Sequence, residues 1–222
     1  MDHRNLNVFG GSARRSNGVS RRQMLVGGAV VGAASVLSVP LIANRAEATP
    51  RADRRNDAQI LNNALKYEHA AIWAYNVGAG KLSDANVGQA VLAIALANQA
   101  DHKQHRDVLA AAVRSLGGTP VMAEESYDLS SYIQGGEGNL DSDVNIAKLA
   151  LALEVDAAIA YSKEIAQLKT PALITAGATI GSTEASHATL IRAAFQSLGV
   201  DIKPIPASFV SAETRSSWIL AV

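Results

Sequence analysis

The chain contains the stretch Glu68-His-Ala-Ala-Ile-Trp-Ala-Tyr75 and, later, a second stretch of the same kind, Glu154-Val-Asp-Ala-Ala-Ile-Ala-Tyr161. In both, a glutamate stands seven residues before a tyrosine with Ala-Ala-Ile between them, shifted by one position in the second copy. At this spacing the two side chains lie two turns apart on one face of a helix. The repetition indicates one helical unit that is used twice.

Each stretch is followed by a histidine and then by a Ser-Leu-Gly stop at the end of the next predicted helix. The histidines are His105 and His187, the stops begin at Ser115 and Ser197, and both features keep one offset of 82 residues. A two-helix unit with a carboxylate on one helix and a histidine on the next, used twice, is how a four-helix bundle builds a two-metal site in its core.

Apolar residues at helical spacing predict four long helices, at about residues 57–82, 84–116, 143–169 and 170–199. Asp57 is the expected N-cap of the first helix, and the connections are short, long and short. The high hydrophobic content of 48% with only 5% aromatics favours packed helices over sheets. We therefore predict an all-α fold: an antiparallel ferritin-like four-helix bundle with one long crossover between helices 2 and 3.

The composition narrows the classes of function. The chain of 222 residues has no cysteine, which excludes disulfides, thiolate catalysis and zinc-thiolate or iron–sulfur sites. Any metal must therefore be held by carboxylates and imidazoles. The formal net charge is zero, but residues 1–48 hold six of the 20 basic and two of the 20 acidic residues. The remaining residues carry a net charge of −4, which gives no basis for nucleic-acid binding.

The N-terminal region has the features of an export signal. Arg21-Arg22 precede an apolar run from Leu25 to Ala43, and Ala46-Glu47-Ala48 forms an A-x-A cleavage site. The paired arginines and their neighbours resemble the twin-arginine signal, which implies export of a folded protein by the twin-arginine machinery. We expect a mature protein that begins at Thr49 and is periplasmic or otherwise extracytoplasmic. An uncleaved signal would instead serve as a membrane anchor.

The expected organisation has four parts. A signal peptide at 1–48 and a linker at 49–56 precede the bundle at 57–199 and a C-terminal strap at 200–222. The strap contains Lys203-Pro204-Ile205-Pro206, which cannot be helical, and it ends in an apolar segment that we expect to pack on the bundle.

A geometric test supports one common polar site. In an antiparallel hairpin, residues equally far from the turn lie at the same height. Glu68 and the His102/His105 pair have their midpoint near residue 86, inside the first predicted turn. Glu154 and the Glu184/His187 pair have theirs near residue 170, at the second turn. Each predicted turn therefore brings the polar residues of its hairpin level with one another.

The glutamate–tyrosine spacing and the E-x-x-H motif that follows resemble the ferritin-like, rubrerythrin-type proteins with carboxylate-bridged dimetal sites. The resemblance covers roughly residues 57–199 and implies metal ligands at matching positions. This chain differs from the family pattern at His102, where the pattern has a glutamate. Asp101 is the other candidate for the ligand at this position. The candidate metal ligands are Glu68, His102, His105, Glu154, Glu184 and His187.

Charge balance favours a metal at this site. Burying three carboxylates unpaired costs several kcal/mol per ion, and the predicted core stripes contain no Lys or Arg. A metal is the simplest counter-charge. We expect two metal ions, with iron as the first candidate. Manganese and zinc are alternatives, because three imidazoles weaken the argument for iron. A degraded site without metal is left open.

Three further residues have local interpretations. Tyr75 and Tyr161 either donate hydrogen bonds to site carboxylates or are core aromatics with a wet hydroxyl. His69 lies about 100° around the helix from Glu68 and is expected to face solvent.

The resemblance implies an exported dimetal oxidoreductase that reacts with O2 or peroxide, or oxidises Fe(II). Its partners would be a small-molecule oxidant or a metal ion, and a chain without cysteine would need an external electron donor. The alternative is a non-catalytic bundle for envelope stress or partner binding, with a lost or structural metal site, which His102 favours. The catalytic residues, the substrate and the existence of a homodimer are left open.

Overall fold

The computed structural model describes residues 50–222, and in that part of the chain all regular structure is helical. Four helices are long and two are short. In chain order they are α3 (Arg51–Ala79), α4 (Asn86–Ser115), α5 (Ser130–Gln134), α6 (Asp143–Ile165), α7 (Pro171–Ser197) and α8 (Arg215–Trp218). The predicted export signal and its cleavage site lie outside the described residues.

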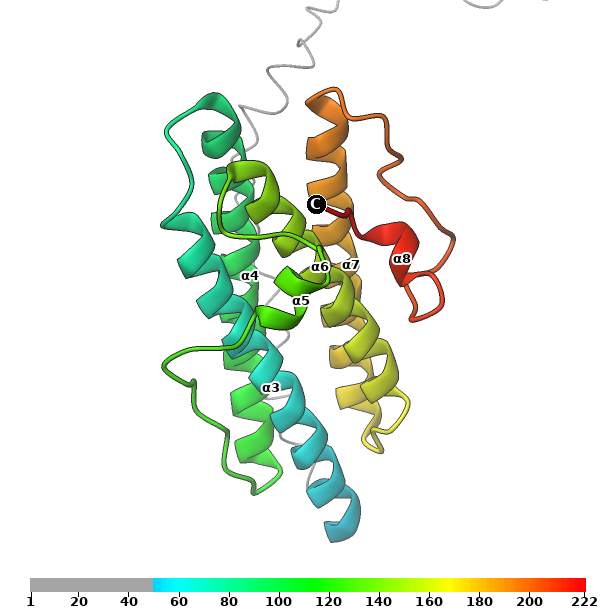
Figure 1. Ribbon diagram of the computed structural model, residues 1–222. Helices are drawn as coiled ribbons and strands as arrows, with labels where there is room; N and C mark the ends of the chain where they lie inside the picture. Colours follow the sequence, from blue (N-terminus) through cyan, green and yellow to red (C-terminus); the bar gives the residue numbers. More distant parts are fainter. Residues whose placement is uncertain (1–49) are drawn as a thin grey trace, which may run out of the picture. The chain divides into compact units, whose positions relative to one another are not determined.

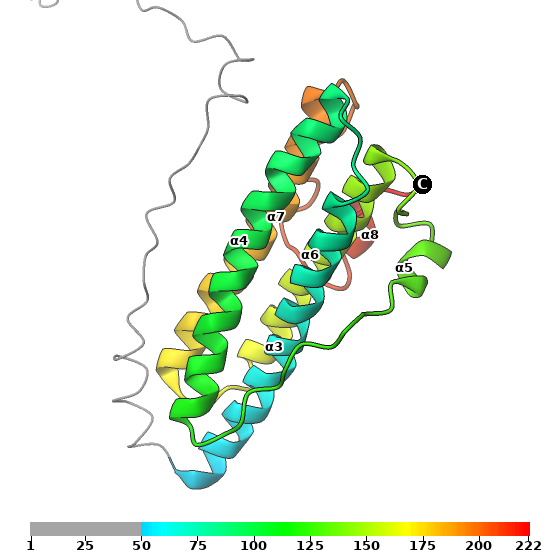
Figure 2. The same ribbon diagram turned by 90° about the vertical axis from the view of Figure 1, so that its left-hand side faces the viewer.

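The four long helices form an antiparallel bundle of two hairpins (Figure 1). Helix α3 packs mainly against α4, and α6 packs mainly against α7. The crossover leaves α4 at one end of the bundle, passes α3 and the short α5, and reaches the start of α6 at the other end (Figure 2). The predicted all-α class and the four-helix bundle with one long crossover are confirmed.

Local sequence chemistry accounts for the helix ends. Thr170 is the N-cap of α7 and Pro171 its first residue, a position where proline loses no hydrogen bond. Ser142 caps α6 by accepting a hydrogen bond from the backbone N–H of Asn145. At the end of α4 the chain turns at Gly117, whose φ of 80° is a left-handed conformation that glycine adopts without strain.

The first helix begins earlier than predicted. Residues 51–56, expected to form part of a linker, are helical, because Pro50 takes the N-cap position and no helix-breaking residue follows it. Asp57 therefore lies inside α3 and does not cap it. Its fully buried carboxylate instead accepts hydrogen bonds from the backbone N–H groups of Lys169 and Thr170, both at 2.9 Å.

This aspartate has a counterpart 86 residues later, the same offset that separates Glu68 from Glu154. Asp143, the first residue of α6, accepts hydrogen bonds from the backbone N–H of Ser83 at 2.8 Å and from its hydroxyl at 2.5 Å. Each hairpin therefore supplies an aspartate that holds the turn of the other hairpin.

The crossover is attached to the outer side of α3. Asn62 donates a hydrogen bond to the carbonyl of Thr119 at 3.0 Å and accepts one from the N–H of Val121 at 2.9 Å. His69, expected to face solvent, is half-buried under this segment, with its Nε2 atom 3.2 Å from the carbonyl oxygen of Val121. The long connection passes over this face of the helix, which the sequence pattern did not indicate.

The C-terminal segment lies against the outer face of α6 and α7. Trp218 is buried among apolar residues of these helices, including Val155 and Ile191. Arg215 donates paired hydrogen bonds to Glu137 in the crossover and to Asp156 in α6, at 2.6–2.8 Å. This arginine joins the tail, the crossover and α6.

Among residues 50–222, no helix combines the length and the apolar character needed to cross a bilayer.

Candidate metal centre

Six polar side chains meet at mid-height in the bundle, and each of the four long helices contributes at least one. They are Glu68 from α3, His102 and His105 from α4, Glu154 from α6, and Glu184 and His187 from α7. Five are buried, and the side chain of His105 is 13% exposed. The structure thus brings together all six candidate ligands at the height that the hairpin geometry predicts.

The first group of donor atoms centres on Glu68. His102 Nδ1 lies 2.7 Å from Glu68 Oε2, and His105 Nδ1 lies 3.7 Å from Glu68 Oε1. Glu184 reaches over from the second hairpin, placing its Oε1 atom 2.9 Å from His105 Nδ1. One atom from each of Glu68, His102, His105 and Glu184 can be chosen so that all four lie within 4.8 Å of one another.

The second group centres on Glu154. His187 Nδ1 lies 3.2 Å from Glu154 Oε2 and 3.4 Å from Glu184 Oε2. His102 Nε2 lies 3.3 Å from Glu154 Oε1 and 3.7 Å from Glu184 Oε2. The two groups therefore share His102 and Glu184, which lie between Glu68 and Glu154.

His102, and not Asp101, occupies the centre of the cluster. Its ring is buried, and its two nitrogens face the glutamates of different hairpins. Asp101, whose side chain is 46% exposed, places Oδ2 3.1 Å from His187 Nε2. A carboxylate on the outer nitrogen of an imidazole orients the ring and raises the basicity of the inner nitrogen. Asp101 therefore supports His187.

Two tyrosines form hydrogen bonds from one hairpin to the other. Tyr75 of α3 donates a hydrogen bond to Glu154 of α6, and Tyr161 of α6 donates one to Glu68 of α3. Burial, together with these carboxylates, raises the pKa of both phenols well above the ordinary value, so both remain protonated donors. Of the two interpretations for these residues, the structure supports hydrogen bonding, and each tyrosine reaches the glutamate of the other unit.

Asn98 makes the two halves unequal. Its side-chain amide donates to the Tyr75 hydroxyl at 3.0 Å and to Glu154 Oε1 at 3.4 Å. The position 82 residues later is Ile180, which offers no such donor. The sequence analysis assigned Asn98 no role; the signal available for it was a polar side chain one turn before His102.

Opposite charges stabilise one another within the cluster. Burial alone would lower the pKa of His105 and His187, but the glutamates raise them to about 9 and about 10. Glu154 and Glu68 likewise raise the pKa of His102 well above its usual range.

The imidazoles act on the glutamates in return. Burial would raise the pKa of Glu68 and Glu154, yet the neighbouring histidines hold both below the ordinary value. For Glu184 burial dominates, and its pKa is raised. Three imidazoles thus face three carboxylates.

The donor set fits a divalent metal ion. Both Glu184 oxygens and His105 Nδ1 are buried without a hydrogen-bond partner, although they lie only 2.9 Å apart at their closest. Native proteins seldom leave buried charged groups without partners, so these atoms mark a place for a cation. Carboxylate oxygens and imidazole nitrogens suit iron, manganese and zinc.

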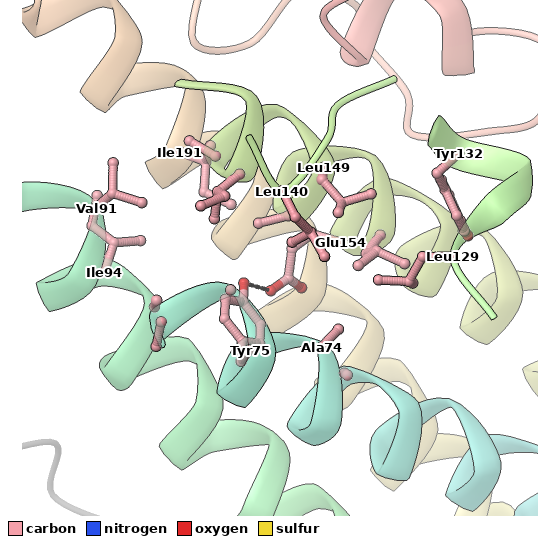
Figure 3. A pocket seen from close by; sticks show the side chains of 18 of the residues that line it. Ala74, Tyr75, Val91, Ile94, Leu129, Tyr132, Leu140, Leu149, Glu154 and Ile191 are labelled. Carbon is pink, nitrogen blue, oxygen red and sulfur yellow. Dashed lines mark hydrogen bonds between the residues drawn. The ribbon is translucent and has the colours of Figure 1, made fainter. Parts of the chain in front are cut away.

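The cluster divides the bundle into two unlike halves. Towards the α6–α7 turn, large side chains fill the interior, among them Leu61, Leu65 and Val113. Towards the α3–α4 turn lies a cavity of about 690 Å³. Figure 3 shows the hydrogen-bonded Tyr75 and Glu154 within this cavity, with Val91 and Ile94 on one side.

Small residues create this cavity. After Glu68, helix α3 continues with alanines and a glycine on the inner face, including Ala70, Ala71, Ala74 and Gly78, and α6 adds Ala157 and Ala160. The cavity opens partly to solvent, because exposed side chains such as Tyr67, Val144 and Leu198 belong to its lining.

Comparisons with other proteins agree with this architecture. The family model for a ferritin-like domain matches residues 56–197. The crystal structure of a conserved hypothetical protein from Mycobacterium tuberculosis is similar to this chain, with a TM-score of 0.55 and 25% sequence identity. The similarity covers 71% of this chain and 99% of that one. A comparison with curated proteins found no match.

Proposed function

The chain belongs to the family of ferritin-like domain proteins, and from that membership we propose that it is an exported dimetal protein with redox activity towards a small oxidant. The observation that carries this proposal is the convergence of three buried glutamates and three histidines from all four helices. Iron is the first candidate for the two ions, followed by manganese; zinc has no redox chemistry and would support only a structural site.

Bound metal ions would supply one-electron redox chemistry and positive charge for an anionic or polarisable oxidant. The protein's own residues prepare the site for this. Glu68 and Glu154 are held by the crossed tyrosines, and His187 is oriented by Asp101. Apart from Asp101, whose side chain is 46% exposed, the residues of these contacts are buried.

Fe(II) oxidation by hydrogen peroxide is the simplest balanced reaction that we propose for this site. Two Fe(II) ions each give up one electron. One molecule of hydrogen peroxide takes up these two electrons and two protons and forms two molecules of water. Such a reaction needs no further electron donor, which suits a chain without cysteine.

Metal analysis of the purified protein tests the proposal. We expect about two equivalents of iron or manganese per chain for a site of this type, and consumption of peroxide on addition of Fe(II). The variant Glu184→Ala should lose both properties, while Glu125→Gln, an exposed change in the crossover, should retain them. Full retention of metal and activity in Glu184→Ala would reject this site.

We further propose export by the twin-arginine pathway, supported by Arg21-Arg22, the apolar run after them and Ala46-Glu47-Ala48. Replacing both arginines with lysine should leave the full-length precursor in the cytoplasm. Continued export of the doubly substituted chain would contradict this pathway, and an envelope protein that retains Met1 would indicate an anchor.

The second candidate function is a non-catalytic bundle for envelope stress or partner binding. The specific observation in its favour is that three imidazoles can balance the charge of three carboxylates without metal. In that case the purified protein would contain no stoichiometric metal, and added iron or manganese would leave its thermal unfolding unchanged. Metal-dependent stabilisation would exclude the form of this candidate in which the metal site is lost.

A further inference from the structure

We propose that the cavity beside the metal centre binds a long aliphatic molecule with an uncharged polar end, such as a fatty alcohol. This binding site goes beyond the proposed redox function and does not depend on bound metal. The inference rests on the position of the cavity, the chemistry of its lining and its charges.

The cavity runs between the helices of the bundle and opens partly at its surface, where Tyr67, Val144 and Leu198 are exposed. All four long helices and the crossover line it, from Ala79 near the α3–α4 turn to His102 and Glu154 at the cluster. Ala79 is eleven residues beyond Glu68 on α3, which at 1.5 Å per residue corresponds to about 16 Å along the helix. A space of about 690 Å³ with this length accommodates an extended alkyl chain.

The lining is aliphatic over most of its area. Every lining element except α3 contributes large apolar side chains to it, represented in Figure 3 by Val91, Ile94, Leu129, Leu140, Leu149 and Ile191. Water in a buried space needs several polar partners per molecule, and this surface offers few. A hydrocarbon chain would lose nothing by entering it and would leave bulk water.

The polar groups of the cavity gather at two places. At the inner end Tyr75, His102 and Glu154 lie together, so a terminal oxygen function would find hydrogen-bonding groups there. At the crossover side, Asp128 and Asp156 border the cavity. The ligand therefore has one natural orientation, with its polar end towards the cluster.

The charges of the lining favour an uncharged ligand. Among the described residues that line the cavity there is no lysine or arginine, whereas Asp128, Glu154 and Asp156 are acidic. The nearby Arg215 already makes paired hydrogen bonds to Glu137 and Asp156. His102, the imidazole of the lining, already faces Glu68 and Glu154, so in the metal-free protein an anionic head group would meet carboxylates without a free cationic partner.

Calorimetric titration of the purified protein with 1-dodecanol and with dodecanoate tests the proposal. We expect saturable binding of the alcohol at one site, and binding of the carboxylate that is at least about tenfold weaker because of the acidic lining. Absence of saturable alcohol binding would overturn the proposal. Equal or tighter binding of dodecanoate would overturn the assignment of an uncharged ligand.

Cavity-filling variants locate the site. Ala71→Phe on α3 and Ala157→Phe on α6 place rings in the cavity from facing helices and should weaken alcohol binding about tenfold or more. The matched control is Ala166→Phe, at the exposed C-cap of α6 and outside the cavity, which should bind like the wild type. Unchanged affinity in both cavity variants would place the ligand elsewhere.

A photoreactive alcohol keeps the test decisive if the phenylalanine variants fail to fold. Dodecanol with a diazirine at its methyl end should label α3 near Ala79 or the start of α6, and labelling confined to other segments would refute the proposed orientation. Metal content measured on the same samples separates the two hypotheses. Alcohol binding by a protein that contains no metal would support this binding site and contradict the redox function. Bound metal without alcohol binding would support the redox site and contradict this binding site.

Discussion

His102 is the residue that makes the two halves of the centre chemically different. It stands 82 residues before Glu184, so the two are equivalent positions of the repeat, and both lie between Glu68 and Glu154. A carboxylate has two oxygens that can bind one ion or bridge two, whereas the ring nitrogens of an imidazole point in different directions. The first hairpin therefore brings two imidazoles and one carboxylate to the centre, and the second hairpin brings one imidazole and two carboxylates.

Substitution of His102 tests this asymmetry. His102→Glu should tighten iron or manganese binding on the order of tenfold, because hard divalent ions prefer carboxylate and residue 102 belongs to both groups of donor atoms. Glu184→Ala should lose more metal than His102→Ala, since it removes charge shared by both groups. Metal stoichiometry and affinity of the three variants provide the measurement, and equal, undiminished binding in all of them would place the metal elsewhere.

Glu164 carries a prediction about pH. Burial raises its pKa to about 7, although the Tyr67 hydroxyl acts in the opposite direction, and its Oε2 atom is buried without a partner. Because the folded protein holds this proton more tightly than the unfolded chain, stability is lost as pH rises from about 4.5 to about 7. After allowance for its partial exposure, Glu164→Gln should stabilise the protein by about 1–2 kcal/mol at pH 8.

Denaturant unfolding at pH 5 and pH 8 measures this effect. The gain in Glu164→Gln should be present at pH 8 and nearly absent at pH 5, where both the native carboxyl and the amide are uncharged. Glu125→Gln in the exposed part of the crossover should change neither value. A gain of the same size at both pH values would show that the charge of Glu164 is not its cause.

The convergence of the six candidate ligands could be predicted from the sequence. Helix periodicity determines which face of a helix a residue lies on, and hairpin symmetry determines its height in the bundle. Whether they bind metal stays a prediction. The crossing of Tyr75 and Tyr161 could not be read from spacing, since it depends on which helices face each other across the bundle. The role of Asp101 likewise follows from a contact between α4 and α7.

At the scale of helices and turns, the exchange of aspartates between hairpins connects the two units. Asp57 accepts two backbone hydrogen bonds from the α6–α7 turn while fully buried. The variant Asp57→Ala would leave those donors without this acceptor and should lower the free energy of unfolding by about 2–4 kcal/mol.

Thermal or urea unfolding would measure the loss in Asp57→Ala. Asp57→Asn retains one acceptor oxygen and should lose less. The counterpart Asp143→Ala, at the more exposed α3–α4 turn, should also be milder. If Asp57→Ala were as stable as the wild type, the interaction between α3 and the α6–α7 turn would contribute nothing to the fold.

Helix existence was easier to predict than helix ends. The four long helices appear where apolar periodicity placed them, yet α3 starts at Arg51 and α6 ends at Ile165. Asp57 had the chemistry of an N-cap, but its carboxylate serves a turn more than 100 residues away in sequence. Local patterns carry no information about such distant partners.

At the scale of the whole described domain, the C-terminal segment stabilises the outer face of the second hairpin. Trp218 is buried against α6 and α7 and donates a hydrogen bond from Nε1 to the carbonyl of Phe209 at 2.8 Å. Trp218→Ala should destabilise the fold by about 3–5 kcal/mol through the lost volume. Since the tryptophan does not reach the cluster, metal content of the folded fraction should be unchanged.

Phe209→Ala is the control in the same segment, because this side chain is 74% exposed and should contribute little. Comparing the unfolding midpoints of the two variants separates packing from mere removal of an aromatic ring. Equal stability of Trp218→Ala and the wild type would show that the tail is dispensable for the bundle.

The cluster also has a consequence for how the halves of the chain recognise each other during folding. Docking of the two unlike hairpins brings three imidazoles together with three carboxylates, and glutamates across the interface raise the pKa of His102 and His105. Two copies of one hairpin would instead combine four imidazoles with two carboxylates, or two with four, and leave the charges unbalanced. A histidine in place of a glutamate at residue 102 thus favours docking of unlike halves within one chain over pairing of like halves from two chains.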